Sequence, residues 1–180
     1  MTKEEARKII AERKRTLSDS YKKQADKNIF KQLIQSEQYK KANTLFCYVS
    51  MKDETDTWMF LHKALEDGKT VGVPVCIGKG IMEVREIHNL EDLEKGAYGI
   101  MEPKDTCRKM EKYEFDLGII PCVAADDRKR RLGHGAGYYD RYLEGTDFLK
   151  VMICWKKLLL EEVPVDVHDI EMDWLITEKN

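Results

Sequence analysis

The sequence predicts an α/β fold: a three-layer α/β/α sandwich with a largely parallel central sheet and N-terminal helices packed on it. Short apolar runs of the kind that form buried strands alternate along the chain with amphipathic stretches of helical period. Such alternation is typical of a parallel sheet covered by helices on both faces. The composition, 42% apolar and 36% charged, is that of a globular protein. The length of 180 residues favours a single domain over residues 1–180.

Three helices are expected in the first part of the chain. Residues 3–16 are mostly helix formers, and their apolar positions fall on one side of the helix. Ser18 or Ser20 can cap a second helix that extends to about Ser36, because a serine side chain accepts hydrogen bonds from the first free N–H groups of a helix. A third helix over 56–65 is followed by a glycine, which favours the left-handed conformation after a last helical turn.

Apolar runs rich in β-branched residues predict the strands. The runs at 44–49 and 115–121 are almost continuously apolar, as in strands buried on both faces, whereas 81–87 alternates in character. A short helix is expected over 137–143, after a glycine-rich loop. In chain order, the expected strands cover residues 44–49, 71–75, 81–87, 115–121, 150–155 and 173–176.

The charge balance excludes several classes of partner. With 31 Lys and Arg against 33 Asp and Glu, the formal net charge is −2, which gives no overall attraction to nucleic acid or to an anionic membrane. The longest apolar runs, such as Leu117–Val123, are far shorter than the ~20 residues that cross a bilayer. The N-terminus is too charged for a secretory signal. We therefore expect no nucleic-acid partner and no membrane segment.

Cysteine usage indicates a reducing compartment. The five cysteines are scattered and include no Cys-x-x-Cys pair, which is unlike a disulfide framework or a structural zinc site. The sequence therefore predicts reduced, mostly buried thiols in a cytoplasmic protein, which we expect to act as a monomer.

The most informative stretch is Arg131–Asp140, where Gly133, Gly135 and Gly137 fall within five residues between a buried strand and a short helix. Glycines allow positive φ and let a ligand approach main-chain N–H groups. A helix that begins near Gly137 would direct free N–H groups at an anion in the loop. Arg131 and its basic neighbours add mobile positive charge on an exposed loop. These features suit a bound polyphosphate, and the spacing fits a glycine-rich turn beside a solvated basic run equally well.

Charged residues elsewhere allow both a functional and a structural interpretation. Lys3 and Arg7 are four residues apart and share one helix face. That face fits an anion-binding site, and it equally fits a helix face that is only solvated. Asp53, Glu54 and Asp56 follow the first expected strand, at the edge where open α/β sheets bind ligands. The same acidic residues also suit the N-terminus of the next helix, where the dipole favours negative charge.

The C-terminal segment is acidic, with Asp166, Asp169, Glu171 and Asp173 close together. Hard carboxylates suit Mg²⁺ and the cation on a nucleotide, although a solvated loop has the same composition. Of the four histidines, only His134, inside the glycine-rich loop, has a context that suits ligand binding. No Ser or Cys in these motifs has an adjacent general base, so the sequence does not support acyl-enzyme chemistry.

The run Arg131–Asp140 closely resembles the signature of the 5-formyltetrahydrofolate cyclo-ligase (5,10-methenyltetrahydrofolate synthetase) family, which reads Arg-Leu-Gly-x-Gly-x-Gly-Tyr-Tyr-Asp. The likeness extends in family order over nearly the whole chain, through Lys3-x-x-x-Arg7, Val49–Thr57, Gly68–Val71 with Pro74, Gly99–Pro103 and Val163–Asp169. The sequence departs from the family pattern at Ala125, where an aromatic residue is usual, at Lys129, where a turn glycine is common, and at Leu158, which often is glutamine.

The resemblance implies an ATP- and Mg²⁺-dependent cyclisation of 5-formyltetrahydrofolate to 5,10-methenyltetrahydrofolate, with release of ADP and phosphate. In the route this implies, the γ-phosphoryl group moves to the formyl oxygen, the folate's other bridging nitrogen attacks the activated carbon, and phosphate leaves. In such chemistry the protein mainly positions the two substrates and stabilises the charge that develops on the phosphoryl group. The absence of a nucleophile–base pair is consistent with it.

The resemblance also assigns roles, with Arg131 as the catalytic residue. The implied ATP-binding residues are Lys3, Arg7, Arg131, Leu132, Gly133, His134, Gly135, Ala136, Gly137, Tyr138 and Tyr139. The implied folate-binding residues are Val49, Glu54, His134, Gly135, Ala136, Gly137 and Tyr138. Asp140 and Asp169 are the implied Mg²⁺ ligands. Two other functions stay open: a different nucleotide-dependent transferase or kinase on a similar scaffold, and a nucleic-acid-binding module that uses Arg128–Arg131, against which the net charge counts.

Overall fold

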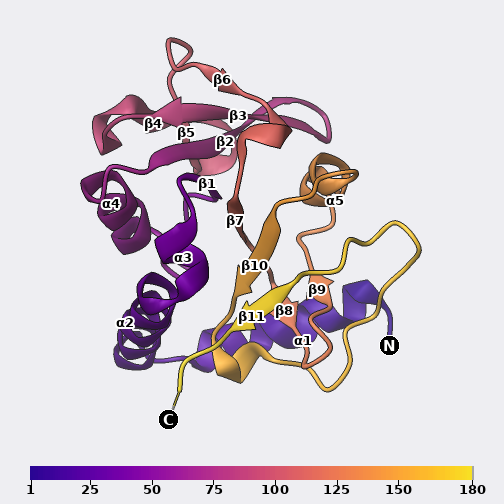
Figure 1. Cartoon of the computed structure of the whole chain (residues 1–180). Helices are drawn as coiled ribbons and strands as arrows, with labels where there is room; N and C mark the ends of the chain where they lie inside the picture. Colours follow the sequence, from indigo (N-terminus) through magenta and orange to yellow (C-terminus); the bar gives the residue numbers. More distant parts are fainter. Residues whose placement is uncertain (180) are drawn as a thin grey trace.

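A computed structural model describes residues 1–179; Asn180, the last residue of the expected single domain, lies outside the described residues. Its centre is a seven-stranded sheet in the order β11-β10-β7-β1-β2-β3-β6 (Figure 1). The first five strands of that order run parallel, and β3 and β6 are antiparallel additions at one edge. The strands are β1 (Thr44–Cys47), β2 (Thr70–Gly78), β3 (Ile81–Ile87), β6 (Lys109–Met110), β7 (Leu117–Ile120), β10 (Leu149–Ile153) and β11 (Trp174–Ile176).

Serine and threonine side chains set the boundaries of the N-terminal helices. Thr2 and Glu5 form a reciprocal capping box at the start of the first helix, and Ser18, rather than Ser20, caps the second. Ser36 ends the second helix and caps a third, five-residue helix that the sequence analysis did not expect. The helices are α1 (Lys3–Thr16), α2 (Asp19–Gln35), α3 (Glu37–Lys41), α4 (Trp58–Glu66) and α5 (Tyr138–Leu143).

Helices cover both faces of the sheet, as expected for the three-layer fold. On one face the Phe46 ring of β1 packs against Tyr139 and Tyr142 of α5, with ring centres 6.0 and 5.8 Å apart. On the other face α2 and α4 pack together, and Phe60 of α4 meets Tyr39 of α3 at 5.5 Å. Opposite faces follow from topology, because the β1-to-β2 and β7-to-β10 connections move in opposite directions and parallel crossovers are right-handed.

Four short strands form two separate hairpins that the sequence analysis missed. They are β4 (Leu93–Lys95) with β5 (Met101–Pro103), and β8 (Ala124–Ala125) with β9 (Arg131–Leu132). Strands of two or three residues contain too few positions to show a period of two, which is why the pattern did not indicate them. The longer expected strands are present, with β3 at the predicted bounds and β1 two residues shorter.

Over the described residues, no helix combines the length and the apolar character needed to cross a bilayer. All five cysteines are free thiols; Cys47 and Cys154 are buried, and the other three are half-buried.

Candidate active site

The strand order creates a switch point between β1 and β7. From β1 the chain passes through α4 to β2 on one side, whereas from β7 it reaches β10 on the other side. In open α/β sheets, ligands bind beyond the carboxyl ends of the strands at such a point. Val49 and Glu54 follow β1, and Pro121 directly follows β7. This edge is therefore where a ligand site is expected, and the glycine-rich loop lies against it.

Arg131 lies at this edge as a buried residue. Its side chain is 5% exposed, and Nη2 lies 3.4 Å from Oδ1 of Asp140 in α5. Nη1 donates a 2.9 Å hydrogen bond to the carbonyl of Pro121, and the guanidinium lies 5.7 Å from the centre of the Tyr139 ring. The expectation of a mobile, exposed arginine is therefore wrong. Because Arg131 begins β9, its side chain bridges the end of β7 and the start of α5.

A buried carboxylate shapes the turn that leads to Arg131. Asp126 is fully buried. Its side chain accepts hydrogen bonds from the backbone N–H groups of Arg128 at 3.0 Å, Arg130 at 3.2 Å and Val163 at 2.8 Å, and from Nε of Arg130 at 2.7 Å. At the tip of the turn Lys129 has φ +64°, which explains why a glycine is common there in the family. Residues 126–131 thus form an ordered turn around the buried Asp126 carboxylate rather than a solvated charged segment.

Asp126→Asn is expected to destabilise the protein in a pH-dependent way. Burial alone raises the pKa of the Asp126 carboxyl, but the hydrogen bonds from Val163 and Arg130 outweigh it and hold the pKa below its usual range. A lowered folded-state pKa gives stability that is present above the unfolded pKa of about 3.9 and is lost as pH falls through the folded-state value. The amide nitrogen of asparagine cannot accept a hydrogen bond, so we expect a loss of about 2–4 kcal/mol at pH 7.

Denaturant unfolding of wild type and Asp126→Asn between pH 7 and pH 3 checks this. The difference in unfolding free energy is expected to be constant above about pH 5 and to shrink below about pH 4. The exposed neighbour Asp127, changed to asparagine, serves as the matched control and is expected to unfold like wild type at every pH. A difference between wild type and Asp126→Asn that is independent of pH would contradict the role of the ionised carboxylate.

The glycine-rich loop places its backbone against arginine side chains. Gly135 and Gly137 have φ +105° and +76°, so the predicted positive φ is confirmed at both. Arg7 of α1 donates a 2.8 Å hydrogen bond from Nε to the carbonyl of Gly133, and a Cβ at Gly135 would lie only 3.3 Å from its guanidinium carbon. The structure therefore joins α1 to the loop, and Arg7 belongs to the same site as Arg131.

Lys3 joins α1 to the acidic C-terminal segment. Its Nζ lies 2.8 Å from Asp166 and 2.6 Å from Asp169. Partial burial alone would lower the pKa of the Lys3 ammonium. The hydrogen bonds and charges of both carboxylates raise it by more, so the pKa of Lys3 lies above its usual value. Asp166 is a contact that the sequence-based site assignment lacked, although the residue lies in the acidic segment that the composition singled out.

The two predicted metal ligands belong to segments that contact one another. Oδ1 of Asp140 accepts a hydrogen bond from the N–H of Ile170 at 3.2 Å, next to Asp169 in the chain. Oδ2 of Asp140 makes no hydrogen bond to any described residue, whereas both oxygens of Asp169 are engaged by Lys3. Asp140 therefore presents a free carboxylate oxygen, and Asp169 presents one only when Lys3 moves away.

Glu54 and His134 meet on the sheet side of the loop. The Glu54 side chain is only 10% exposed and lies 3.7 Å from Nε2 of His134, while its Oε1 accepts a hydrogen bond from the N–H of Met51 at 2.9 Å. Asp56, by contrast, accepts from the N–H of Met59 in the first turn of α4. The helix-terminal interpretation therefore holds for Asp56, and Glu54 is the carboxylate that faces the loop.

The other predicted site residues differ in how much they can offer a ligand. Val49 and Leu132 are buried in the core, with 3% and 1% of their surface exposed. They can therefore contact a ligand through their backbone atoms or as part of the wall of a cavity. His134, Gly135 and Ala136 are exposed, and Gly133, Gly137, Tyr138 and Tyr139 are half-buried. Arg141, which was not predicted, donates to the carbonyl of Ala136 at 2.9 Å and braces the loop from α5. Arg141 lies one turn into the predicted short helix, and this spacing could have indicated that its side chain reaches back to the loop.

The departures from the family pattern lie around the site rather than in it. Ala125 is fully buried in β8, directly opposite Arg131 in β9. Leu158 is buried in the one-turn helix that follows β10. Neither replaces a charged residue of the site.

Comparison with known proteins agrees with this geometry. The sequence model of the 5-formyltetrahydrofolate cyclo-ligase family matches residues 1–178. A probable 5-formyltetrahydrofolate cyclo-ligase of Schizosaccharomyces pombe is 35% identical, over 83% of this chain and 82% of that protein. The 5-formyltetrahydrofolate cyclo-ligase of Escherichia coli is 27% identical, over 94% and 96%.

Two solved structures with related sequences have the same fold. The 5,10-methenyltetrahydrofolate synthetase of Aquifex aeolicus superposes with a TM-score of 0.89 and 31% identity, over 100% of this chain and 91% of that one. The synthetase of Mycoplasma pneumoniae, at 22% identity and a TM-score of 0.80, shows the shared fold. The α/β fold expected from the sequence is thus confirmed, and the chain belongs to the 5-formyltetrahydrofolate cyclo-ligase family of enzymes.

Proposed function

We propose that this protein uses ATP and Mg²⁺ to cyclise 5-formyltetrahydrofolate to 5,10-methenyltetrahydrofolate, releasing ADP and phosphate. The observation that carries the proposal is the convergence of α1, the glycine-rich loop and α5 at the sheet's switch point, with Arg7 hydrogen-bonded to Gly133 and Arg131 paired to Asp140. A triphosphate that lies on exposed loop N–H groups would have three cations within one site. It would release Lys3 from its two aspartates in exchange for phosphate oxygens.

Asp140 and Asp169 are the residues that would hold Mg²⁺. Among residues 1–179, no three His, Cys, Asp or Glu side chains are grouped to hold a metal ion. This fits Mg²⁺ on a nucleotide, which usually takes one or two carboxylates and completes its shell with phosphates and water. The free Oδ2 of Asp140 is a hard oxygen donor of the required kind. Mg²⁺, when bound there, would neutralise charge on the phosphates and on the oxygen of the leaving ADP.

The side chains of the chain position the two substrates. Transfer of the γ-phosphoryl group to the formyl oxygen needs the oxygen in line with the leaving ADP, and protein groups contribute orientation and charge rather than a covalent bond. Glu54, in the segment that follows β1, faces the loop, and its carboxylate can accept hydrogen bonds from the amino and N–H groups of a pterin. The other bridging nitrogen then attacks the activated carbon, loses its proton, and phosphate leaves. His134, 3.7 Å from Glu54, would then lie close to both substrates.

A single assay tests the function. Purified protein with 5-formyltetrahydrofolate, ATP and Mg²⁺ is expected to produce the methenyl absorbance together with equimolar ADP, and omission of either ATP or Mg²⁺ is expected to abolish both. Turnover without nucleotide, or none with every component present, would reject the proposal. ATP hydrolysis that is independent of the folate would instead indicate a different nucleotide-dependent enzyme. A cytoplasmic location and a monomeric state stay predictions.

A further inference from the structure

Two of the cysteines come together at the edge of the sheet where the candidate site lies. Strands β7 and β10 pair in parallel, and their last aligned residues are Ile120 and Met152. Counting on two residues along each strand aligns Cys122 with Cys154. Aligned residues of neighbouring parallel strands point to the same face of the sheet, and such strands are about 4.7–4.9 Å apart. That spacing suits a disulfide, whose Cα atoms are usually about 4.4–6.8 Å apart.

The contacts of the two thiols show that the strands stay together beyond their last aligned residues. The thiol of Cys122 donates a hydrogen bond to the carbonyl of Ile153, the residue directly before Cys154, over 3.4 Å. The neighbouring Cys122 thiol, and then burial, hold the pKa of the Cys154 thiol well above its usual value. Cys47, the other buried thiol, aligns with Ile119 and is therefore roughly 10 Å further back along the sheet.

The two thiols differ in how well a reagent in solution can reach them. Cys122 is half-buried, whereas Cys154 is only 1% exposed. Because a thiol reacts as its thiolate, burial and a raised pKa make Cys154 a poor first nucleophile. Cys122 is therefore the thiol that meets an oxidant, and Cys154 is the neighbour that can react with it afterwards.

The Cys122–Cys154 pair adjoins the groups that hold Arg131. Pro121, whose carbonyl accepts the 2.9 Å hydrogen bond from Nη1 of Arg131, directly precedes Cys122. On the other side of Cys122, the N–H of Val123 donates to the carbonyl of Leu132 at 2.7 Å. This short segment thus contacts β9 through its backbone and β10 through its thiol. A movement of Cys122 toward β10 also moves the carbonyl that positions Arg131.

We propose that Cys122 and Cys154 form a reversible redox pair, in which a small peroxide converts the two thiols to a disulfide that shifts the Pro121 carbonyl away from Arg131 and lowers the enzyme's activity. Disulfides of proteins in reducing compartments are usually transient and redox-sensing. The effect on activity rests on the proposed function, whereas formation of the disulfide does not.

The oxidation is a two-electron reaction in two steps. The Cys122 thiolate attacks one peroxide oxygen and the O–O bond breaks, which leaves a sulfenic acid on Cys122 and releases water once the leaving oxygen is protonated. The sulfur of Cys154 then attacks the sulfenic sulfur. The S–O bond breaks, and the hydroxyl leaves with the Cys154 proton as a second water. Two thiols and one peroxide thus give one disulfide and two waters, and a dithiol reductant reverses the change by thiol–disulfide exchange.

Peptide mapping of the full chain tests whether the pair forms. Reduced protein, freed of reductant, is treated with hydrogen peroxide, its remaining thiols are alkylated under denaturing conditions, and it is digested with trypsin. Of the five cysteines, the two of the pair are expected to be protected and the other three alkylated. Peptide 113–128, which contains Cys122, is expected to be linked to peptide 151–156, which contains Cys154, until dithiothreitol separates them.

Cysteine variants test the order of the two steps. Cys154→Ala removes the second thiol, so oxidation is expected to stop at the sulfenic acid, which dimedone traps on peptide 113–128. Cys122→Ala is expected to give neither the dimedone adduct nor the disulfide. Cys107→Ala is the matched control, because it removes a half-buried thiol outside the pair, and it is expected to form the disulfide as wild type does.

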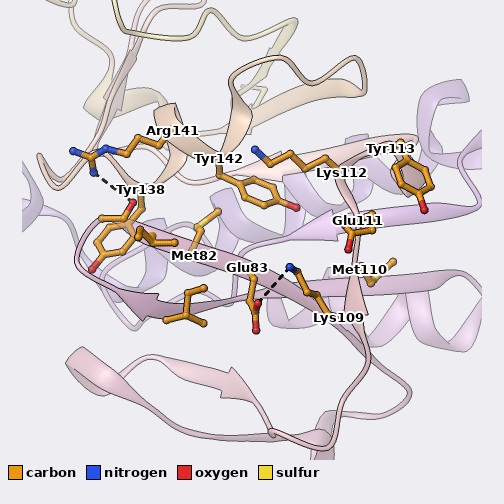
Figure 2. Close-up of a pocket in the computed structure, with 13 residues that line it drawn as sticks. Met82, Glu83, Lys109, Met110, Glu111, Lys112, Tyr113, Tyr138, Arg141 and Tyr142 are labelled. Atoms are coloured by element: carbon orange, nitrogen blue, oxygen red, sulfur yellow. Dashed lines mark hydrogen bonds and ion pairs between the residues drawn. The ribbon is translucent and has the colours of Figure 1, made fainter.

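Activity gives the functional readout. After catalase has removed the peroxide, the disulfide form is expected to turn over about 10- to 100-fold more slowly than the reduced protein, since a misplacement of about 1 Å can have an effect of that size. Met82 and Met110, which line the groove between the β2–β3 hairpin and α5 (Figure 2), offer thioethers to the same oxidant. Dithiothreitol reduces a disulfide but not a methionine sulfoxide, so recovery with dithiothreitol assigns the loss to thiols.

The Cys122→Ala variant completes this test, because it is expected to keep its own activity through the same treatment. Five alkylated cysteines after oxidation, a disulfide between other cysteines, or an oxidised form as active as the reduced one would each overturn the proposal. An equal and reversible loss of activity in Cys122→Ala would overturn it as well. Absence of turnover by the reduced protein would instead reject the proposed function, and the peptide map and the dimedone adduct would still decide whether the pair forms.

Discussion

Arg131→Ala is expected to lose both nucleotide use and a large part of its stability. The guanidinium is buried, donates to the carbonyl of Pro121 at 2.9 Å, and lies 3.4 Å from Asp140. Truncation leaves the Pro121 carbonyl without that donor and the Asp140 carboxylate without its cation. Loss of one partner from a buried ion pair costs about 3–5 kcal/mol. For a chain of this length, that lowers the melting temperature by roughly 6–20 °C.

The expected kinetic effect has the same origin. Arg131 would contribute positive charge beneath the proposed triphosphate and would hold Asp140 in place, so kcat/KM for ATP is expected to fall about 10²-fold or more. Arg131→Lys keeps the charge but cannot bridge Pro121 and Asp140 with one planar group, and is expected to be intermediate in both measurements. Melting curves and steady-state kinetics with varied ATP provide the two readouts.

Arg128→Ala is the matched control, because Arg128 is an exposed member of the same basic run. It is expected to leave both the melting temperature and the kinetics unchanged. If Arg131→Ala behaved like Arg128→Ala, the run would be a solvated segment, and the ion pair with Asp140 would contribute little.

The long elements were predictable because local chemistry determines them. The serine cap at Ser18, the end of the second helix near Ser36 and the alternating run that becomes β3 are each visible in a short stretch of sequence. The positive φ at Gly135 and Gly137 was predictable for the same reason, since only glycine adopts it at little cost.

The burial of Arg131 was not predictable from its neighbours. Arg128–Arg131 resembles a solvated basic run, and nothing within it indicates that one arginine is enclosed. The enclosing groups are the Pro121 carbonyl, ten residues earlier, and Asp140, nine residues later. Asp126 was missed in the same way, because one of its hydrogen bonds comes from Val163, which is 37 residues away. Tertiary contacts of this kind have no signature in a local window.

Asp140→Asn is expected to keep the fold and to lose most of the turnover. Oδ1 of Asp140 accepts from Ile170 and pairs with Arg131, whereas Oδ2 makes no hydrogen bond to the described residues. An asparagine oxygen can occupy the Oδ1 position and keep the bond from Ile170. Its amide nitrogen then replaces Oδ2, the oxygen proposed for Mg²⁺, with a group that cannot bind a cation. The negative charge that faces the buried Arg131 and a favourable helix-dipole contribution of about 0.3–1 kcal/mol are also lost, so the melting temperature is expected to fall although the protein still folds.

The Mg²⁺ dependence separates a metal ligand from a charge that only stabilises the helix. If Asp140 binds the ion, Asp140→Asn needs about tenfold or more Mg²⁺ for half-maximal activity, and its maximal rate falls about 10- to 100-fold. Asp169→Asn is the informative comparison, because both oxygens of Asp169 are engaged by Lys3. That variant leaves Lys3 paired with Asp166 alone, so we expect a smaller shift in Mg²⁺ requirement and little change in affinity for ATP. An unshifted Mg²⁺ titration of Asp140→Asn would assign the carboxylate to the pair with Arg131 and the dipole of α5, and would remove it from the metal site.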